Sequence, residues 1–447
     1  MTEPVQQSER ALVRALGPLA LAASIVNVTI GGGIFRLPAG VAAQLGAAAP
    51  LAYLVCAVAM GLIVLCFAEA GSRVALTGGP YAYVEVAFGP FVGFMAGVLL
   101  WLLGTLAVAA VSTIFADAVG ALVPALAGGA ARAAVLGLTL LVLSLVNVRG
   151  VRQGTRLNTV ATVAKLLPLL LLVVAGAFAV RPENLRIDAA PTAGALAGTS
   201  ILLIFAFSGI ESALVPSGEV REPARTVPRA IFVAMVAVTL LYVALQLVVQ
   251  GVLGAEIGAP AASGAPLAEA AGRVLGPWGR TLLLVGATVS MFGYVSGMTL
   301  AVPRALFAFA RDGFLPAALA AVHARFRTPH VAILVQSAVV FALAVSGGFE
   351  RLAILANLSA LLLYLACCAA SWELRRRNVQ TGGGVPFRVP AAGLVPALAI
   401  GVIVWLLTSI GAADWAAVGG ALVVAAAVYL LTRGRRAAHL RDLPTLP

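Results

Sequence analysis

Charged residues are scarce in this chain of 447 residues: they make up 10% of it, whereas hydrophobic residues make up 62%. A soluble domain carries about 25% charged residues, so the composition excludes an ordinary water-soluble fold. Alternating apolar and polar strands of about ten residues are also missing, which argues against an outer-membrane barrel. The sequence therefore predicts an all-α membrane protein.

Histidine and cysteine are also few, with three and four residues. They form no cluster with the spacing of metal ligands, so we expect no metal site and no cofactor. The three histidines lie in or beside the loops between apolar stretches, so no Ser–His pair is available within the membrane for proteolysis. No filter-like repeat indicates a channel. An intramembrane enzyme that uses Glu211 and Lys165 as acid and base is the alternative from another functional class.

What the chain does contain is twelve apolar stretches, each close to the length of about 20 residues that a transmembrane helix needs. The gaps between them are too short for a soluble domain. We therefore expect one domain over residues 17–432, with tails at 1–16 and 433–447. The stretches cover residues 17–41, 50–70, 91–119, 133–149, 157–180, 194–217, 229–253, 280–303, 330–346, 351–372, 393–411 and 414–432.

The basic residues that give the net charge of +12 are distributed unevenly between the two sides of the predicted membrane topology. With a cytoplasmic N-terminus, 21 of the 29 basic residues fall in cytoplasmic tails, loops or helix ends, six face outside, and Arg36 and Lys165 lie within apolar stretches. This asymmetry is the positive-inside pattern. It predicts a multi-pass protein of the inner plasma membrane, surrounded by lipid, with both termini in the cytoplasm and no nucleic-acid partner.

Two of the apolar stretches are interrupted. The first contains Gly31, Gly32 and Gly33, followed by Arg36 and Pro38, and these are mostly poor helix formers. The alternative is that the glycines only pack helices closely. An unwound segment would leave N–H groups that lipid cannot satisfy but a substrate carboxylate can.

The sixth stretch has a similar interruption, where Gly209 and the ionisable Glu211 break an apolar run. The first and sixth stretches open successive blocks of five. Interrupted helices in matching positions of two halves indicate the substrate site of a transporter built from inverted repeats.

The single lysine of the chain, Lys165, lies in the fifth stretch, while arginine fills every other basic position. A charge at the membrane centre costs about 2.5–3.5 kcal/mol, which indicates a functional need. A buried lysine can release its proton and an arginine cannot. Lys165 is therefore predicted either to carry a proton or to replace a bound cation; the alternative is a lysine that extends to the interface. Glu211 is a second candidate coupling residue, and structural hydrogen bonding is its alternative.

Several motifs resemble the amino acid–polyamine–organocation superfamily of permeases along nearly the whole chain. The glycine-rich segment 31–35 and the segment Phe205–Glu211 resemble the two halves of that family's substrate site. Further similarity lies in the segments 69–71, 78–83, 88–90, 218–229 and 303–316.

The resemblance implies a leucine-transporter-type fold. It consists of two inverted repeats of five helices, at about 17–180 and 194–372, and two extra helices at about 393–432. It also implies an amino acid substrate, whose carboxylate meets the glycine segment and whose amine meets carbonyl groups near Phe205, with Phe205 as an aromatic gate. The implied substrate-binding residues are Thr29, Gly31, Gly32, Gly33, Phe205, Ala206, Ser208 and Gly209.

By the same resemblance, Lys165 occupies the place of a bound sodium ion, with Ser290 or Ser296 as neighbouring partners. This implies sodium-independent transport, either by exchange or coupled to protons. The positions expected to face the substrate, Leu103, Gly104, Val108 and Met298, are apolar or small, which favours a neutral amino acid. Cationic amino acids and polyamines are the alternative substrates.

Overall fold

The computed structural model describes residues 17–74, 76, 79–149, 155–187, 189–214, 220, 222–259, 264–381, 385–389, 391 and 393–441. Over these residues the chain is helical, and no strand is formed. The helices are α2 (Pro18–Thr29), α3 (Gly33–Leu45), α4 (Ala49–Arg73), α5 (Pro80–Phe88), α6 (Pro90–Leu122), α7 (Gly129–Val148), α8 (Thr155–Ala177), α9 (Ala193–Phe207) and α10 (Ile210–Ala213).

The second part of the chain continues in the same way. Its helices are α11 (Pro223–Leu253), α13 (Pro266–Leu275), α14 (Pro277–Ala301), α15 (Pro303–Arg311), α16 (His330–Ser346), α17 (Phe349–Arg376), α18 (Leu394–Leu407) and α19 (Ala412–Arg441). Short 3₁₀ turns are η1 (Gly46–Ala48), η2 (Pro124–Leu126), η3 (Pro182–Leu185), η5 (Gly254–Gly258) and η6 (Ala317–Ala320).

Many of these helices begin at a proline, which fits the first helical turn because its fixed φ is helical and the missing N–H would have no partner there. Gly89 shows how one helix is separated from the next. Its φ of 86° turns the chain after α5, and Pro90 then starts α6. Glycine adopts this left-handed conformation without steric cost.

Seven helical segments in the described part of the chain are long and apolar enough to cross a membrane, so the protein is an integral membrane protein. They are Gly33–Arg73, Pro90–Leu122, Gly129–Val148, Ala224–Gly258, Pro277–Arg311, Phe349–Arg376 and Ala412–Thr432. Four shorter apolar helices accompany them: Lys165–Ala177, Ala193–Phe207, His330–Ser346 and Leu394–Leu407.

A helix lies in each of the twelve apolar stretches of the sequence, but some boundaries differ from the expected ones. The helices α5 and α13 were not expected, because they are short and lie between the long apolar stretches. The last helix continues to Arg441, beyond the end of its apolar stretch at 432. Arginine, alanine and leucine are good helix formers, so helix formation outlasts the apolar run.

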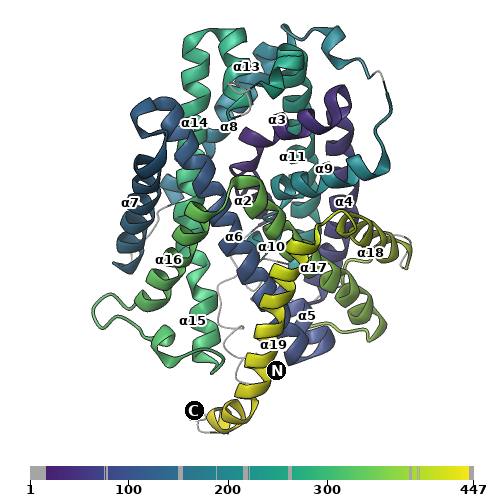
Figure 1. Ribbon diagram of the computed structural model, residues 1–447. Coiled ribbons are helices and arrows are strands. Elements are labelled where there is room, and N and C mark those ends of the chain that lie inside the picture. Colours follow the sequence, from purple (N-terminus) through teal and green to yellow (C-terminus); the bar gives the residue numbers. More distant parts are fainter. Residues whose placement is uncertain are drawn as a thin grey trace.

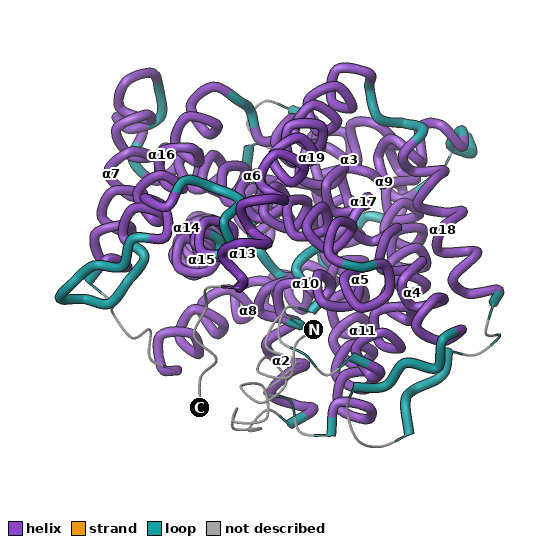
Figure 2. The backbone as a smooth tube through the Cα atoms, turned by 90° about the horizontal axis from the view of Figure 1, so that it is seen from below, coloured by secondary structure: helices purple, strands orange, loops and turns teal. Residues whose placement is uncertain are grey.

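The long helix α6 crosses the middle of the molecule, and α14 and α17 pack against it (Figure 1). The helices α7 and α16 lie at one side, and α4 and α18 lie at the other. The view from below gives the same order (Figure 2). Most of α6 is buried, and most of its buried apolar side chains belong to the main hydrophobic core, while Phe94 and Val98 belong to a second, smaller cluster.

Both predicted helix interruptions are present. Residues 30–32 separate α2 from α3, and Ser208 and Gly209 separate α9 from α10. Gly209 has a φ of 120°, in a region that side-chain-bearing residues rarely adopt. Each interruption leaves helix ends in the interior of the molecule, where backbone polar groups need partners.

Candidate functional site

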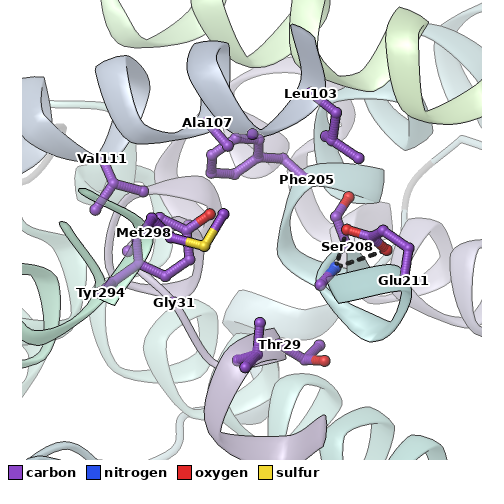
Figure 3. Close-up of a pocket in the computed structure, with 15 residues that line it drawn as sticks. Thr29, Gly31, Leu103, Ala107, Val111, Phe205, Ser208, Glu211, Tyr294 and Met298 are labelled. Atoms are coloured by element: carbon purple, nitrogen blue, oxygen red, sulfur yellow. Dashed lines mark hydrogen bonds between the residues drawn. The ribbon is translucent and has the colours of Figure 1, made fainter. Parts of the chain in front are cut away.

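The two interruptions line one cavity, together with residues of α6 and α14 (Figure 3). Seven of the eight predicted binding residues belong to its wall: Thr29, Gly31, Gly32, Gly33, Phe205, Ser208 and Gly209. Glu211 also lines the cavity. Ala206 and Lys165 do not line it. The carbonyl oxygen of Ala206 accepts from the Tyr242 hydroxyl, and the ammonium group of Lys165 donates to the carbonyl oxygen of Asn27. The sequence thus predicted which two segments meet here.

The glycine segment presents backbone donors to the cavity. The N–H of Gly31 donates to the carbonyl oxygen of Thr29 at 2.8 Å. The N–H groups of Gly32 and Gly33 have no acceptor among the described residues, and they stand at the beginning of α3. Such a helix N-terminus carries a partial positive charge and binds anions. This end of the cavity therefore suits a carboxylate.

The opposite polarity comes from α9, which ends at Phe207 beside the same cavity. The last carbonyl groups of a helix lack intrahelical partners and carry a partial negative charge. One of them, the carbonyl of Ala206, accepts a hydrogen bond from the Tyr242 hydroxyl at 2.9 Å. The cavity therefore lies between a positive and a negative half-helix end, which is the charge pattern of a zwitterion.

Tyr242 of α11 is a functional candidate that the sequence did not indicate. Its hydroxyl lies 2.9 Å from the Ala206 carbonyl oxygen and 3.1 Å from the Thr29 carbonyl oxygen. It thus joins the two interrupted helices through one side chain that is fully buried. An aromatic residue in an apolar helix gives no sequence signal, since tyrosine is common in hydrophobic cores.

Lys165 extends from α8 to the end of α2. Its ammonium nitrogen lies 2.6 Å from the carbonyl oxygen of Asn27 and 3.0 Å from that of Ile30, and the residue is 5% exposed. A lysine that extended to the interface would not be buried in this way. The expected partner Ser290 is not bonded to it: the Ser290 hydroxyl has no partner among the described residues.

The carboxylate of Glu211 is bound by protein groups. Its two oxygens accept from the N–H of Gly209 at 2.9 and 3.0 Å, and one of them accepts from the Tyr364 hydroxyl at 2.7 Å. These bonds fix the start of α10 (Figure 3). The structural role that the sequence left open for Glu211 is thus present, although the residue also lines the cavity.

The remaining wall is mostly apolar. Leu103, Gly104 and Met298 line the cavity as the sequence predicted, but Ala107 and Val111 take the place of Val108. Tyr294 of α14 was not predicted and adds an aromatic ring with a hydroxyl group (Figure 3). The space left free is small, about 30 Å³, which is enough for a water molecule. Binding of a larger solute therefore requires the walls to move apart.

A chain of contacts links Phe205 with charged residues near the ends of α6 and α7. The ring of Phe205 packs edge-on against that of Phe349, with the two ring centres 5.5 Å apart. The Arg36 guanidinium lies 5.9 Å from the Phe349 ring centre. Arg36 pairs with Asp117 at 3.0 Å, and Asp117 also binds Arg132 at 2.9 Å. Arg36 thus shares the Asp117 carboxylate with Arg132.

The chain is similar to known proteins along most of its length. The model of a protein family described as amino acid permease matches residues 16–431. The methylthioribose transporter of Bacillus subtilis is 27% identical over 446 residues, which cover 96% of this chain and 95% of that protein. The serine/threonine exchanger SteT of Bacillus subtilis is 28% identical over 444 residues, covering 96% and 99%. The L-lysine transport protein of Corynebacterium glutamicum is 34% identical over 336 residues, covering 71% and 66%.

Proposed function

Because the chain belongs to the amino acid permease family, we propose that it carries neutral amino acids across the membrane by alternating access, without sodium. Members of this family and the relatives of this chain are transporters, so the protein is a transporter and not an enzyme. The observation that carries the proposal is the cavity between two interrupted helices with opposite half-helix charges.

In the proposed complex, the substrate carboxylate accepts hydrogen bonds from the N–H groups of Gly32 and Gly33. The substrate amine donates to carbonyl groups at the end of α9, near Phe205. The hydroxyl of Thr29 lines the cavity and has no partner among the described residues, which leaves it available for the substrate. Phe205 closes over the bound molecule, supported by its contact with Phe349.

The hydrogen bonds that the Glu211 carboxylate accepts favour a substrate with a neutral side chain. This carboxylate already accepts from two buried donors, the Gly209 N–H, which both oxygens share, and the Tyr364 hydroxyl, and removing these partners would leave buried polar groups unsatisfied. The rest of the wall offers apolar and small side chains. The serine/threonine exchanger among the relatives is consistent with a small neutral substrate.

Cationic amino acids are the second candidate class. Glu211 is the one carboxylate of the described residues that lines this cavity, and one relative is an L-lysine transport protein. For a cationic substrate, Glu211 would have to exchange its bond from Tyr364 for one from the substrate. Loss of lysine transport in Glu211→Gln, with serine transport retained, would favour this class.

For coupling, Lys165 holds the place of a bound cation against the end of α2. Transport then proceeds either by exchange or coupled to protons. The proposed architecture has twelve membrane crossings, with two inverted repeats of five helices, two extra helices and both termini in the cytoplasm. The distribution of the basic residues supports this topology.

The test is uptake into sodium-free proteoliposomes that contain the purified protein. Unlabelled serine, threonine, leucine, lysine, arginine and methylthioribose are supplied outside as competitors and inside as exchange substrates. Competition and counter-transport by neutral amino acids are expected. Inhibition by lysine or by methylthioribose alone would contradict the proposed substrate class.

A further inference from the structure

A wide apolar groove runs along the outside of the helix pair α4 and α11, away from the transport cavity. It has a volume of about 800 Å³ and is lined almost entirely by apolar side chains. Val58 of α4 and Phe232 and Leu240 of α11 are 64%, 67% and 67% exposed in it. Pockets of about 300–1,000 Å³ are typical of ligand sites, so the groove is large enough for a bound molecule.

One end of the groove carries positive charge. Arg225 and Arg229 line it within the first turns of α11, at the beginning of the apolar segment Ala224–Gly258. Arg225 pairs with Glu222 at 3.6 Å, but both side chains are about three-quarters exposed, at 76% and 74%, and such surface pairs are weak. No described acidic side chain forms an ion pair with Arg229.

The length of the groove matches one half of a bilayer. From Arg225 to Leu240 the helix rises by roughly 22 Å at 1.5 Å per residue. A bilayer is about 40–45 Å thick when its headgroup regions are included, so one half contributes about 20–22 Å. A groove that begins at the arginines therefore ends near the bilayer centre, and only its charged end reaches the headgroup region.

We propose that this groove binds an anionic glycerophospholipid, whose phosphate pairs with Arg225 and Arg229 and whose acyl chain lies between α4 and α11. Arginine forms strong hydrogen bonds with phosphate oxygens, and basic pockets between transmembrane helices bind anionic headgroups. The apolar surface accepts the chain along one leaflet. The site goes beyond the proposed transport function and does not depend on the substrate that is carried.

The test is native mass spectrometry of the full-length protein, purified in detergent, stripped of lipid and titrated with phosphatidylglycerol or phosphatidylcholine. We expect preferential binding of phosphatidylglycerol. Each arginine contributes about fivefold to the affinity, so the double variant Arg225→Gln/Arg229→Gln is expected to bind phosphatidylglycerol roughly 30-fold more weakly. The control Arg304→Gln/Arg311→Gln removes two exposed arginines from α15, outside the groove, and should bind normally.

A second pair of variants tests the apolar part without changing charge. A Cβ atom at Gly61 meets nothing within 4 Å, so Gly61→Phe is expected to fill the groove and reduce lipid binding. Gly401 of α18 also has open space, and Gly401→Phe should leave binding unchanged. Equal affinity for both lipids in all variants would overturn the proposal. A two-chain complex that Gly61→Phe dissociates would assign the groove to a second copy and would also overturn it.

Discussion

The ammonium nitrogen of Lys165 lies 2.6 Å from the carbonyl oxygen of Asn27, and this contact places a positive charge at the C-terminal end of α2. The carbonyl groups of a last helical turn have no intrahelical partners and carry partial negative charge. A cation is therefore stabilised at this point, and Lys165 provides it covalently. Because α2 ends beside the substrate cavity, the lysine is positioned to link α8 with the glycine segment.

Lys165→Met should lose most transport, because a neutral side chain cannot hold the carbonyl groups of Asn27 and Ile30. Lys165→Arg should also fail to restore normal cycling, because the guanidinium is larger, planar and unable to release a proton. Uptake is measured in sodium-free proteoliposomes with and without a pH gradient. Wild-type uptake driven by the gradient would identify a proton carrier, and exchange that ignores the gradient would identify a fixed charge. Full activity of Lys165→Met under both conditions would exclude the lysine from the mechanism.

Gly32→Val should abolish substrate binding while the protein remains folded. A Cβ atom at Gly32 would lie 3.1 Å from Val111 and 3.2 Å from Met291. The branched side chain therefore occupies the approach of the carboxylate and crowds these neighbours. Binding is measured by calorimetry or by a ligand-induced thermal shift, and monodisperse elution in detergent reports folding. Gly401→Val is the matched control, since the space around Gly401 is open. Unchanged affinity in Gly32→Val would contradict the carboxylate assignment.

The interrupted helices could be predicted from the sequence because glycine and an ionisable residue stand out inside apolar runs. The same contrast identified Lys165, which is buried against the end of α2. These signals are local: each residue type conflicts with the lipid environment expected around it. The two segments that line the cavity were therefore recognisable without knowledge of the fold.

Contacts between distant segments could not be read from the sequence. Arg36 and Asp117 are far apart in the chain, and neither residue identifies the other. The wall of the cavity depends on the rotation of α6 about its axis, so that Ala107 and Val111, rather than Val108, face inward. A uniformly apolar helix has no polar face that would fix this rotation.

Glu69→Gln should destabilise the protein. The Glu69 side chain is fully buried, and its oxygens accept from Arg73 at 3.0 and 3.1 Å, from Arg375 at 2.7 Å and from the N–H of Val389 at 3.2 Å. Removing the carboxylate leaves buried arginine charge uncompensated, which costs about 3–5 kcal/mol. Thermal unfolding is followed with a maleimide dye that reacts with the four cysteines, all buried in the folded protein.

The matched control for that measurement is Glu373→Gln. Glu373 also pairs with two arginines, Arg376 and Arg377, but these are 70% and 52% exposed. Exposed pairs contribute about 0–1 kcal/mol, so its melting temperature should stay close to that of the wild type. Equal melting temperatures for the two variants would show that the buried Glu69 network does not stabilise the fold.

Tyr242→Phe should weaken substrate binding by roughly fivefold while the protein stays folded, since one hydrogen bond contributes about 1 kcal/mol. The Tyr242 hydroxyl lies within bonding distance of the Thr29 and Ala206 carbonyl oxygens, so its loss releases both interrupted helices from α11. Tyr53→Phe is the control, because the buried Tyr53 hydroxyl has no partner among the described residues. Affinity is measured by substrate competition in proteoliposomes. If Tyr53→Phe and Tyr242→Phe lower affinity equally, general loosening of the core explains both effects, and the link through Tyr242 does not organise the site.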